Sequence, residues 1–132
     1  MTFLLDVNAL VALGFAQHEF HDRVARWLHA ERDAVLATCS ITELGFVRIL
    51  SQAPAYALTV AQAKILLLRI KKASFISFEF VTDNHDVSHL PGWVKTAKQT
   101  TDGHLARLAS ANGGVLATLY PRIEGSYLVP GK

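Results

Sequence analysis

The sequence predicts an α/β fold in which a mainly parallel sheet is covered by helices. Short apolar runs typical of buried strands stand at residues 3–5, 34–38 and 115–118, and the first two are each followed at once by a helix-like segment. Parallel neighbours need a crossover connection, so strands that alternate with helices favour a parallel sheet. We expect one domain over residues 1–132, since no linker or internal repeat divides the chain.

The first half of the chain shows two strand–helix units. We expect, in order, a strand over 3–5, helices over 7–15 and within 18–31, a strand over 34–38 and a helix over 40–50. In the second helix, large apolar side chains recur at spacings of four, three and one from Phe20 to Leu28, which places them on one face.

The second half adds two helices and three strands. We expect a helix over 59–73, a strand over 75–81, an irregular segment over 82–99, a helix within 100–114 that glycine ends, and strands over 115–118 and 126–129. Thr59 and Gln62 form a capping-box pattern at the start of the first helix. Lys71 and Lys72 suit its carboxyl end, where the helix dipole favours positive charge.

Composition narrows the class of protein. Hydrophobic residues make up 51% of the 132, enough for a sizeable core. Cys39 is the sole cysteine, which excludes an intrachain disulfide and suits a small buried side chain in a reducing compartment. No apolar stretch approaches a membrane span, so we expect a cytoplasmic protein without a membrane partner. A formal charge of +2 permits a polyanionic partner without requiring one.

Three carboxylates fall at equivalent places in this pattern. Asp6 follows the first strand, and Glu43 lies in the first turn of the helix after the second strand. Asp102 lies in the first turn of the helix before the 115–118 strand. Ligands of open parallel sheets bind outside the carboxyl ends of the strands. We therefore expect the three acids to converge at that edge.

Converging carboxylates repel one another unless a cation neutralises them. Mg²⁺ prefers oxygen ligands and uses carboxylates together with waters and phosphates. Such an ion lowers the pKa of a bound water and stabilises charge on a phosphoryl oxygen, which is the chemistry of phosphodiester hydrolysis. We expect Asp6, Glu43 and Asp102 to hold the metal and Asn8 to orient the site by hydrogen bonds.

Each acid also has a structural alternative. Asp6 suits a helix N-cap, whose side chain accepts a hydrogen bond from a free backbone N–H. Ser40 and Glu43 have the spacing of a capping box. Asp102 gains from the dipole in the first turn of its helix. Capping explains each acid separately, whereas a site explains why all three occur at the same predicted edge.

Four segments in order resemble a PIN domain, and more narrowly a VapC-type toxin ribonuclease of a toxin–antitoxin pair. The segments are FLLDVNALVAL with Asp6, HEFHDRVARWL, SITELGFVRIL with Glu43, and TTDGHLARLASANGGVLAT with Asp102 and Thr118. Together they cover nearly the whole chain.

The resemblance implies fold, activity and partners. It implies a three-layer α/β/α domain and a metal-dependent endoribonuclease, with Mg²⁺ or Mn²⁺, that cleaves structured RNA such as tRNA or rRNA. It also implies a small cognate antitoxin and a homodimer, for which the apolar helix over 59–73 is a candidate surface. Asp6, Glu43 and Asp102 correspond to the family's acids, and Thr118 is a supporting residue.

The chain departs from the family pattern at one position. The family usually supplies a fourth acid after the last main strand, where this chain has Tyr120. A tyrosine is neutral at pH 7 and a poor metal ligand. We expect three acids to suffice for one metal, with Glu124 as a possible substitute. The alternative is a catalytically weakened PIN domain that binds RNA or an antitoxin.

Basic and aromatic side chains supply candidates for RNA binding. They are Arg48, Trp93, Lys95, Lys98 and Arg107. Lys95 and Lys98 flank the segment before Asp102, and Trp93 offers a ring on which a base stacks. The alternative is a solvated surface loop.

Two other classes of site fit the sequence less well. The pairs His18/His21 and His85/His89 lack the further ligands of a closed zinc site, so we expect surface or loop histidines. A haloacid-dehalogenase-type phosphatase also opens with a strand-end aspartate, but it wants a second aspartate where this chain has Asn8.

Overall fold

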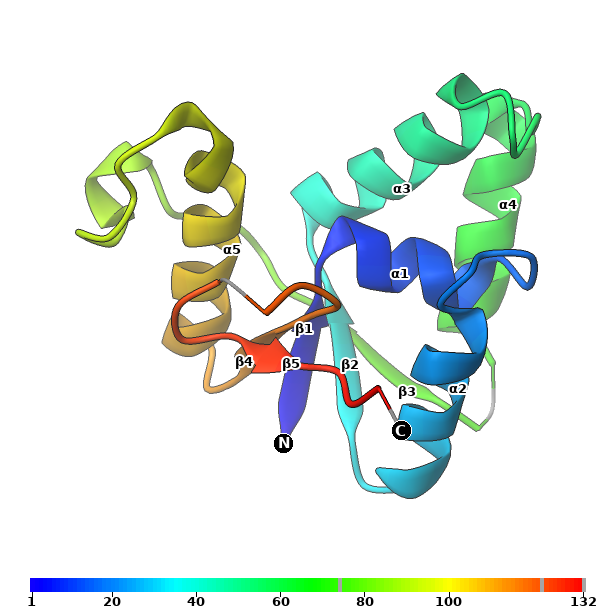
Figure 1. Cartoon of the computed structure of the whole chain (residues 1–132), viewed down its shortest axis with the longest axis horizontal. Coiled ribbons are helices and arrows are strands. Elements are labelled where there is room, and N and C mark those ends of the chain that lie inside the picture. The colour runs from blue at the N-terminus through cyan, green and yellow to red at the C-terminus, as the bar shows by residue number, and fades with distance from the viewer. Residues whose placement is uncertain (74, 122, 132) are drawn as a thin grey trace.

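A computed structural model describes residues 1–73, 75–121 and 123–131 (Figure 1). The first half of the chain contains β1 (Thr2–Leu5), α1 (Val7–Gly14), α2 (His21–Ala30), β2 (Val35–Thr38), α3 (Ser40–Gln52) and α4 (Val60–Lys71). The second half contains β3 (Ser77–Phe80), the 3₁₀ turns η1 (Val87–His89) and η2 (Ala97–Gln99), α5 (Thr100–Ala111), β4 (Val115–Thr118) and β5 (Tyr127–Leu128).

The strands form one sheet in the order β3-β2-β1-β4-β5, and all neighbouring strands are parallel. Phe3 pairs with Leu36 of β2, and Leu4 pairs with Leu116 of β4. This register brings the carboxyl ends of the three central strands to the same edge. The predicted parallel sheet is confirmed.

Helices cover both faces of the sheet. Phe3 and Leu5 point into a core shared with α1, α2, α3 and α4, whereas Leu4 points into a second core shared with α5. This alternation is the two-residue period of a strand that is buried on both faces. Figure 1 shows α5 on one side of the sheet and the other four helices on the opposite side. The expected three-layer α/β/α architecture is confirmed.

An aromatic cluster fastens the C-terminal strand to the first core. The rings of Phe3 and Trp27 meet edge to face with centroids 5.0 Å apart, and Tyr127 of β5 lies 4.9 Å from Phe3. The indole N–H of Trp27 donates to the Tyr127 hydroxyl at 3.2 Å. Arg23 of α2 donates to the Val129 carbonyl at 3.0 Å through Nε. The strand predicted over 126–129 is therefore formed over Tyr127–Leu128 only, and α2 anchors it.

Of the two capping boxes that the sequence predicts, one is formed and the other is not. Thr59 and Gln62 form the expected capping box of α4. The box predicted for Ser40 and Glu43 is wrong, because α3 already begins at Ser40 and its N-cap is Cys39. The Thr42 hydroxyl accepts the Cys39 N–H at 3.0 Å and thereby satisfies the cap. Glu43 is left free for other contacts.

The remaining differences lie at element boundaries. The helix predicted over 40–50 extends to Gln52, and the strand predicted over 75–81 is paired only over Ser77–Phe80. The segment 82–99 is irregular as expected, apart from two single turns of 3₁₀ helix. Among the residues that the structure describes, no helix is both long and apolar enough to cross a membrane.

Candidate functional site

Asp6 stands where the chain passes from β1 into α1. Its backbone is extended, and its Oδ1 accepts the Ala9 N–H at 2.8 Å, so the carboxylate is the N-cap of α1. The backbone N–H of Asp6 continues the sheet by donating to the Ala117 carbonyl of β4 at 3.0 Å. The side chain is only 5% exposed. The capping alternative thus holds for Asp6, and the cap fixes its carboxylate at the carboxyl edge of the sheet.

The electrostatic environment of Asp6 is that of a charge lacking a counter-ion. Burial raises the pKa of the Asp6 carboxyl, and the charge of Asp102 raises it further. Hydrogen bonds from the Thr118 side chain and the Ala9 N–H act in the opposite direction without cancelling the rise. Thr118 is fully buried at the end of β4. Two hydrogen-bond donors therefore orient the Asp6 carboxylate, while burial and the charge of Asp102 disfavour its ionised form.

Asp102 faces the same region from the opposite side of the sheet edge. It lies in the first turn of α5 and is half-buried, and burial raises the pKa of its carboxyl as well. Its neighbour Gly103 packs against Val94 so tightly that a Cβ at this glycine would stand 2.2 Å from Val94 Cγ2. This close packing holds the start of α5, and with it Asp102, against the preceding segment.

Glu43 has a different set of partners. Its Oε2 accepts a hydrogen bond from the Thr38 hydroxyl at 2.6 Å and from the Lys71 ammonium at 2.5 Å. Thr38 ends β2 and is fully buried, and Lys71 is the last residue of α4. Lys71 does stand at a helix carboxyl end, as predicted, but its ammonium reaches across to α3. No local sequence pattern predicts this contact between residues 43 and 71.

The structure thus brings Asp6 and Asp102 within reach of each other's charge and pairs Glu43 with Lys71. Over residues 1–73, 75–121 and 123–131, no three His, Cys, Asp or Glu side chains stand close enough together to hold a metal ion. Asn8 is half-buried in the first turn of α1.

A hard divalent cation fits the pair of Asp6 and Asp102. Mg²⁺ is commonly bound by one or two carboxylates, with waters and phosphates completing its shell. Burial and mutual repulsion make both carboxylates of this pair unfavourable as bare charges. A cation between them would relieve that cost. The donor chemistry therefore suits Mg²⁺ or Mn²⁺ rather than zinc, which prefers nitrogen and sulfur ligands.

Known proteins with similar sequences are ribonucleases. The chain is 35% identical over 120 residues to ribonuclease VapC38 of Mycobacterium tuberculosis, which covers 87% of this chain and 82% of that protein. It is 37% identical over 126 residues to ribonuclease VapC44 of the same species, and the alignment covers 89% of this chain and 85% of VapC44. The chain belongs to the VapC family of ribonucleases. It is also 36% identical over 123 residues to VapC29 of the same species, and this alignment covers 90% of this chain and 86% of VapC29.

Solved VapC structures share the fold. Mycobacterium tuberculosis VapC20, described as a sarcin-ricin loop cleaving toxin, superposes with a TM-score of 0.61 over 92% of this chain and 91% of its own, at 15% identity. VapBC2 from Rickettsia felis, bound to a promoter DNA fragment, gives a TM-score of 0.64 over 97% of both chains, at 16% identity. No protein-family model matches the chain.

Tyr120 gives this VapC protein an uncharged side chain after β4. The ring is 48% exposed, and the backbone N–H donates to Thr118 Oγ1 at 3.1 Å. Thr118 therefore links the backbone at Tyr120 to the Asp6 carboxylate. Glu124 is exposed in the loop that follows. The departure noted in the sequence therefore lies directly beside the candidate site.

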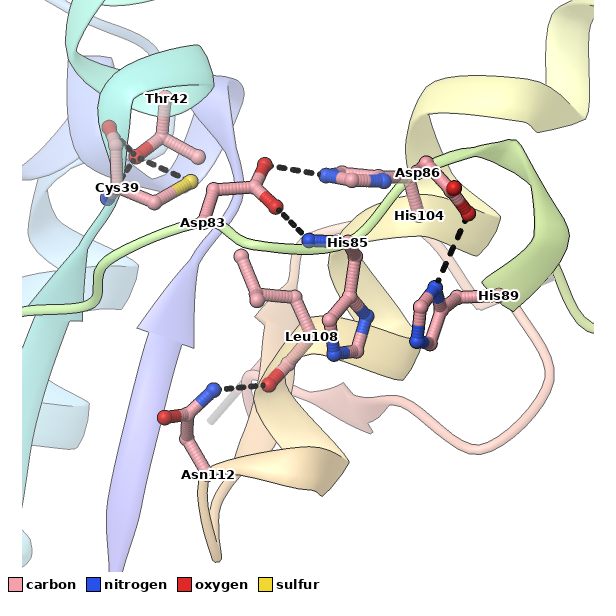
Figure 2. A network of polar contacts seen from close by, with 9 residues as sticks. All are labelled: Cys39, Thr42, Asp83, His85, Asp86, His89, His104, Leu108 and Asn112. Carbon is pink, nitrogen blue, oxygen red and sulfur yellow. Dashed lines mark hydrogen bonds and ion pairs between the residues drawn. The ribbon is translucent and has the colours of Figure 1, made fainter.

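A polar network that the sequence did not predict fastens the irregular segment to α5 (Figure 2). His104 Nε2 lies 2.5 Å from Asp83 Oδ2, and the His85 N–H donates to Asp83 Oδ1 at 3.0 Å. Burial works to raise the pKa of the Asp83 carboxyl, but these contacts together hold it below the usual range. The network positions the segment next to Asp102, which lies two residues before His104.

The histidines expected on the surface or in loops differ in burial. His89 is exposed beside Asp86, whereas the ring of His85 stacks on His89 with centroids 4.1 Å apart. His18 and His21 make backbone hydrogen bonds, with the Phe20 N–H and the Ala12 carbonyl respectively. All four serve local structure, and no zinc site is completed within the described part of the chain.

The candidate RNA-binding residues are partly or fully exposed to solvent. Arg48, Lys95, Lys98 and Arg107 are exposed, and Trp93 is half-buried. Lys95 and Lys98 flank η2, the turn that leads into α5 and Asp102. Their cationic groups are therefore available to a polyanion.

Proposed function

We propose that this VapC protein is a Mg²⁺- or Mn²⁺-dependent endoribonuclease and the toxin of a toxin–antitoxin pair. The observation that carries the metal dependence is the pair of Asp6 and Asp102, whose carboxyl pKa values are raised at the carboxyl edge of the sheet. Membership of a ribonuclease family supports the reaction class. A cytoplasmic location suits an enzyme that acts on cellular RNA.

Each residue of the site has a role in this proposal. Asp6 and Asp102 hold the cation, and the Ala9 N–H and Thr118 keep the Asp6 carboxylate in one orientation. Glu43 is the third acid of the prediction, and Thr38 and Lys71 hold its carboxylate. A cation held there would supply positive charge for the phosphoryl oxygens and would make a bound water a better nucleophile at neutral pH.

The proposed substrate is structured RNA, either tRNA or rRNA. VapC20, which shares the fold, is described as cleaving the sarcin-ricin loop. The exposed cations Arg48, Lys95, Lys98 and Arg107 would contact phosphates, and Trp93 would stack on an unpaired base.

The proposed protein partner is a small cognate antitoxin. The likeness to the VapBC2 complex of Rickettsia felis supports such a pairing. We further propose that two copies of the chain form a homodimer through the helix predicted over 59–73, which the structure places at Val60–Lys71.

The test is cleavage of total tRNA and rRNA by purified, antitoxin-free protein. Reactions contain Mg²⁺, Mn²⁺ or a chelator, and Asp6→Asn is assayed in parallel. We expect discrete metal-dependent fragments, and at least about a 100-fold lower rate in Asp6→Asn because a direct metal ligand is lost. Fragments that persist in chelator or in Asp6→Asn would contradict the proposal.

A second candidate function is a catalytically weakened domain that binds RNA or an antitoxin. The observation that favours it is Tyr120, an exposed neutral side chain where the family usually has an acid. Under this alternative, Tyr120→Asp raises Mn²⁺-dependent cleavage by restoring a charged oxygen ligand. Equal cleavage rates in wild type and Tyr120→Asp would show that three acids suffice.

A further inference from the structure

We propose that the rings of His85 and His89, besides serving local structure, form a stacking platform for an unpaired base of the RNA substrate. The platform lies on the irregular segment between β3 and α5. It would contribute affinity for a base, whereas the candidate lysines and arginines would contribute affinity for phosphates. This inference rests on the proposed function, because it concerns how the same RNA is held.

The two rings of the platform already stack on each other. The ring centroids of His85 and His89 lie 4.1 Å apart, and the ring planes are inclined by only 17° (Figure 2). His85 covers one face of the His89 ring, yet 43% of the His89 side chain is exposed to solvent. A further flat ring therefore has room to extend the stack from the solvent side.

The outer ring, that of His89, is oriented by the turn that contains it. His89 Nδ1 lies 3.4 Å from Asp86 Oδ1, and the Ser88 N–H donates to the same carboxylate oxygen at 2.9 Å. Asp86 is the N-cap of η1, and His89 is the last residue of that turn. A ring that is oriented in advance loses little conformational freedom when a base stacks on it, which favours binding.

The inner ring, that of His85, rests on α5. The His85 N–H donates to Asp83 Oδ1 at 3.0 Å, and the other oxygen of Asp83 pairs with His104 of α5. The rings of His85 and His104 meet edge to face with centroids 6.4 Å apart. Among the described residues, the buried Nδ1 of His85 has no hydrogen-bond partner, so packing and stacking hold this ring. The platform therefore has a firm base.

The same helix supports the platform and a candidate metal ligand. His104 follows Asp102 by two residues in α5, a rise of about 3 Å along the helix axis. The turn η1, which contains His89, also packs against α5. The stack is therefore tied to the first half of the helix that begins at the Asp102 end.

The chemistry of this segment favours single-stranded RNA as the ligand. RNA-binding proteins stack unpaired bases on aromatic and histidine rings, and every base has a π-face. Lys95 and Lys98 lie on the same segment and are exposed, so they supply positive charge for the phosphates of a strand whose base stacks on His89. Bases inside a duplex are already stacked and paired, which makes them unavailable to the platform.

The test is binding of two fluorescently labelled probes to the full chain, in chelator, where the proposed function expects no cleavage. One probe is a short single-stranded RNA, and the other is an abasic strand of the same length and charge. We expect His89→Ala to weaken RNA binding roughly fivefold or more, because one stacked base is lost. Affinity for the abasic strand should change by less than about twofold, since phosphate contacts do not involve the bases. Fluorescence anisotropy measures both affinities.

Three further variants show which property of the rings matters. His89→Phe keeps a flat ring and should bind RNA within about twofold of wild type. His85→Phe keeps the inner ring of the stack and should behave in the same way. His29→Ala is the matched control, because it removes an exposed histidine from α2 and should bind both probes as wild type does.

The outcomes separate this inference from the proposed function. Equal RNA affinity in wild type and His89→Ala would overturn the platform, and so would an equal loss of affinity for both probes, which indicates an ionic contact. A wild-type chain that binds neither probe would overturn it as well. Selective loss of RNA binding in His89→Ala, together with no RNA cleavage by wild type in Mg²⁺ or Mn²⁺, would support the platform and contradict the proposed nuclease.

Folding of the variants is checked by thermal unfolding. His89 is exposed, so we expect His89→Ala to melt within roughly a few degrees of wild type. His89→Gln, which also lacks a ring, replaces His89→Ala if the latter does not fold. It should show the same selective loss of RNA affinity.

Discussion

At the scale of single residues, Asp6 combines two tasks that the sequence presents as alternatives. One carboxylate caps α1 through the Ala9 N–H and also faces Asp102 across the sheet edge. The cap is what fixes the carboxylate, since an N-cap side chain is held against the first turn of its helix. A structural explanation of an acid at a helix start therefore does not argue against a functional one.

The stability of the metal-free protein should depend on pH through Asp6. A carboxyl whose pKa is raised by folding contributes stability that is fully present below its ordinary value of 3.8 and is lost as pH rises through the folded pKa. In chelator, we expect the wild-type melting temperature to fall from this effect as the pH rises from about 4 through the raised pKa of the folded Asp6 carboxyl.

Asp6→Asn should reduce this dependence, because asparagine keeps the cap and removes the buried charge. We expect the melting temperature of the variant at pH 7 to exceed that of wild type by roughly a few degrees in chelator. Differential scanning calorimetry of both proteins across the pH range measures this. A variant less stable than wild type at neutral pH, with the same pH dependence, would contradict the expectation.

At the scale of elements, α1 and α3 meet at a contact that adjoins both helix starts. A Cβ placed on Gly45 would stand 2.5 Å from Cγ2 and 3.1 Å from Cγ1 of Val7, which directly follows Asp6. Glu43 lies two residues before Gly45. The absence of a side chain at Gly45 therefore lets α3, which contains Glu43, pack closely against α1, which Asp6 caps.

Gly45→Ala should destabilise the protein although alanine is the better helix former by about 1 kcal/mol. We expect a net loss of roughly 1–3 kcal/mol in the free energy of unfolding, the usual cost of overpacking. Urea denaturation measures it. Gly92→Ala is the matched control, because a Cβ there meets nothing within 4 Å. A Gly45→Ala variant as stable as wild type would show that α1 and α3 separate at no cost.

The pairing of Asp83 with His104 should hold the irregular segment against α5. Asp83→Asn weakens this pair, so we expect faster amide hydrogen exchange over residues 82–99 with little change in β1 and β4. Exchange followed by mass spectrometry resolves the two regions. Asp86→Asn is the control, because the Asp86 side chain is 77% exposed and pairs with His89 on the surface. Equal exchange in both variants would assign the segment's order to Val94 and its packing on Gly103.

At the scale of the whole molecule, the sequence predicts what depends on local patterns. The strands, the helices and their order follow from apolar runs and helical periodicity, and the edge that gathers Asp6 and Asp102 follows from parallel topology. The contacts of Glu43 with Lys71 and of Asp83 with His104 join residues 28 and 21 positions apart. Such pairs depend on how elements pack, which no local pattern encodes. The Cys39 cap was missed because cysteine is not a preferred N-cap residue.

Assembly is the remaining property at this scale. Exposed apolar side chains recur at three-residue spacing on two neighbouring helices, with Ile41 and Leu44 on α3 and Ile65 and Leu68 on α4. Figure 1 shows the two helices side by side. Exposed apolar patches mark protein interfaces, and a second copy of the chain would bury this one.

The expected homodimer should depend on these two helices. Light scattering after size exclusion should give the mass of two chains for wild type and of one chain for the double variant Leu44→Glu/Leu68→Glu, because buried glutamates in an apolar interface lack partners. Val87→Glu, at an exposed position of η1, is the matched control and should remain dimeric. A wild-type protein that elutes as one chain would leave the patch for the antitoxin. A double variant that stays dimeric would place the interface on another face of the molecule. The two active sites of the dimer would then be oriented differently relative to each other.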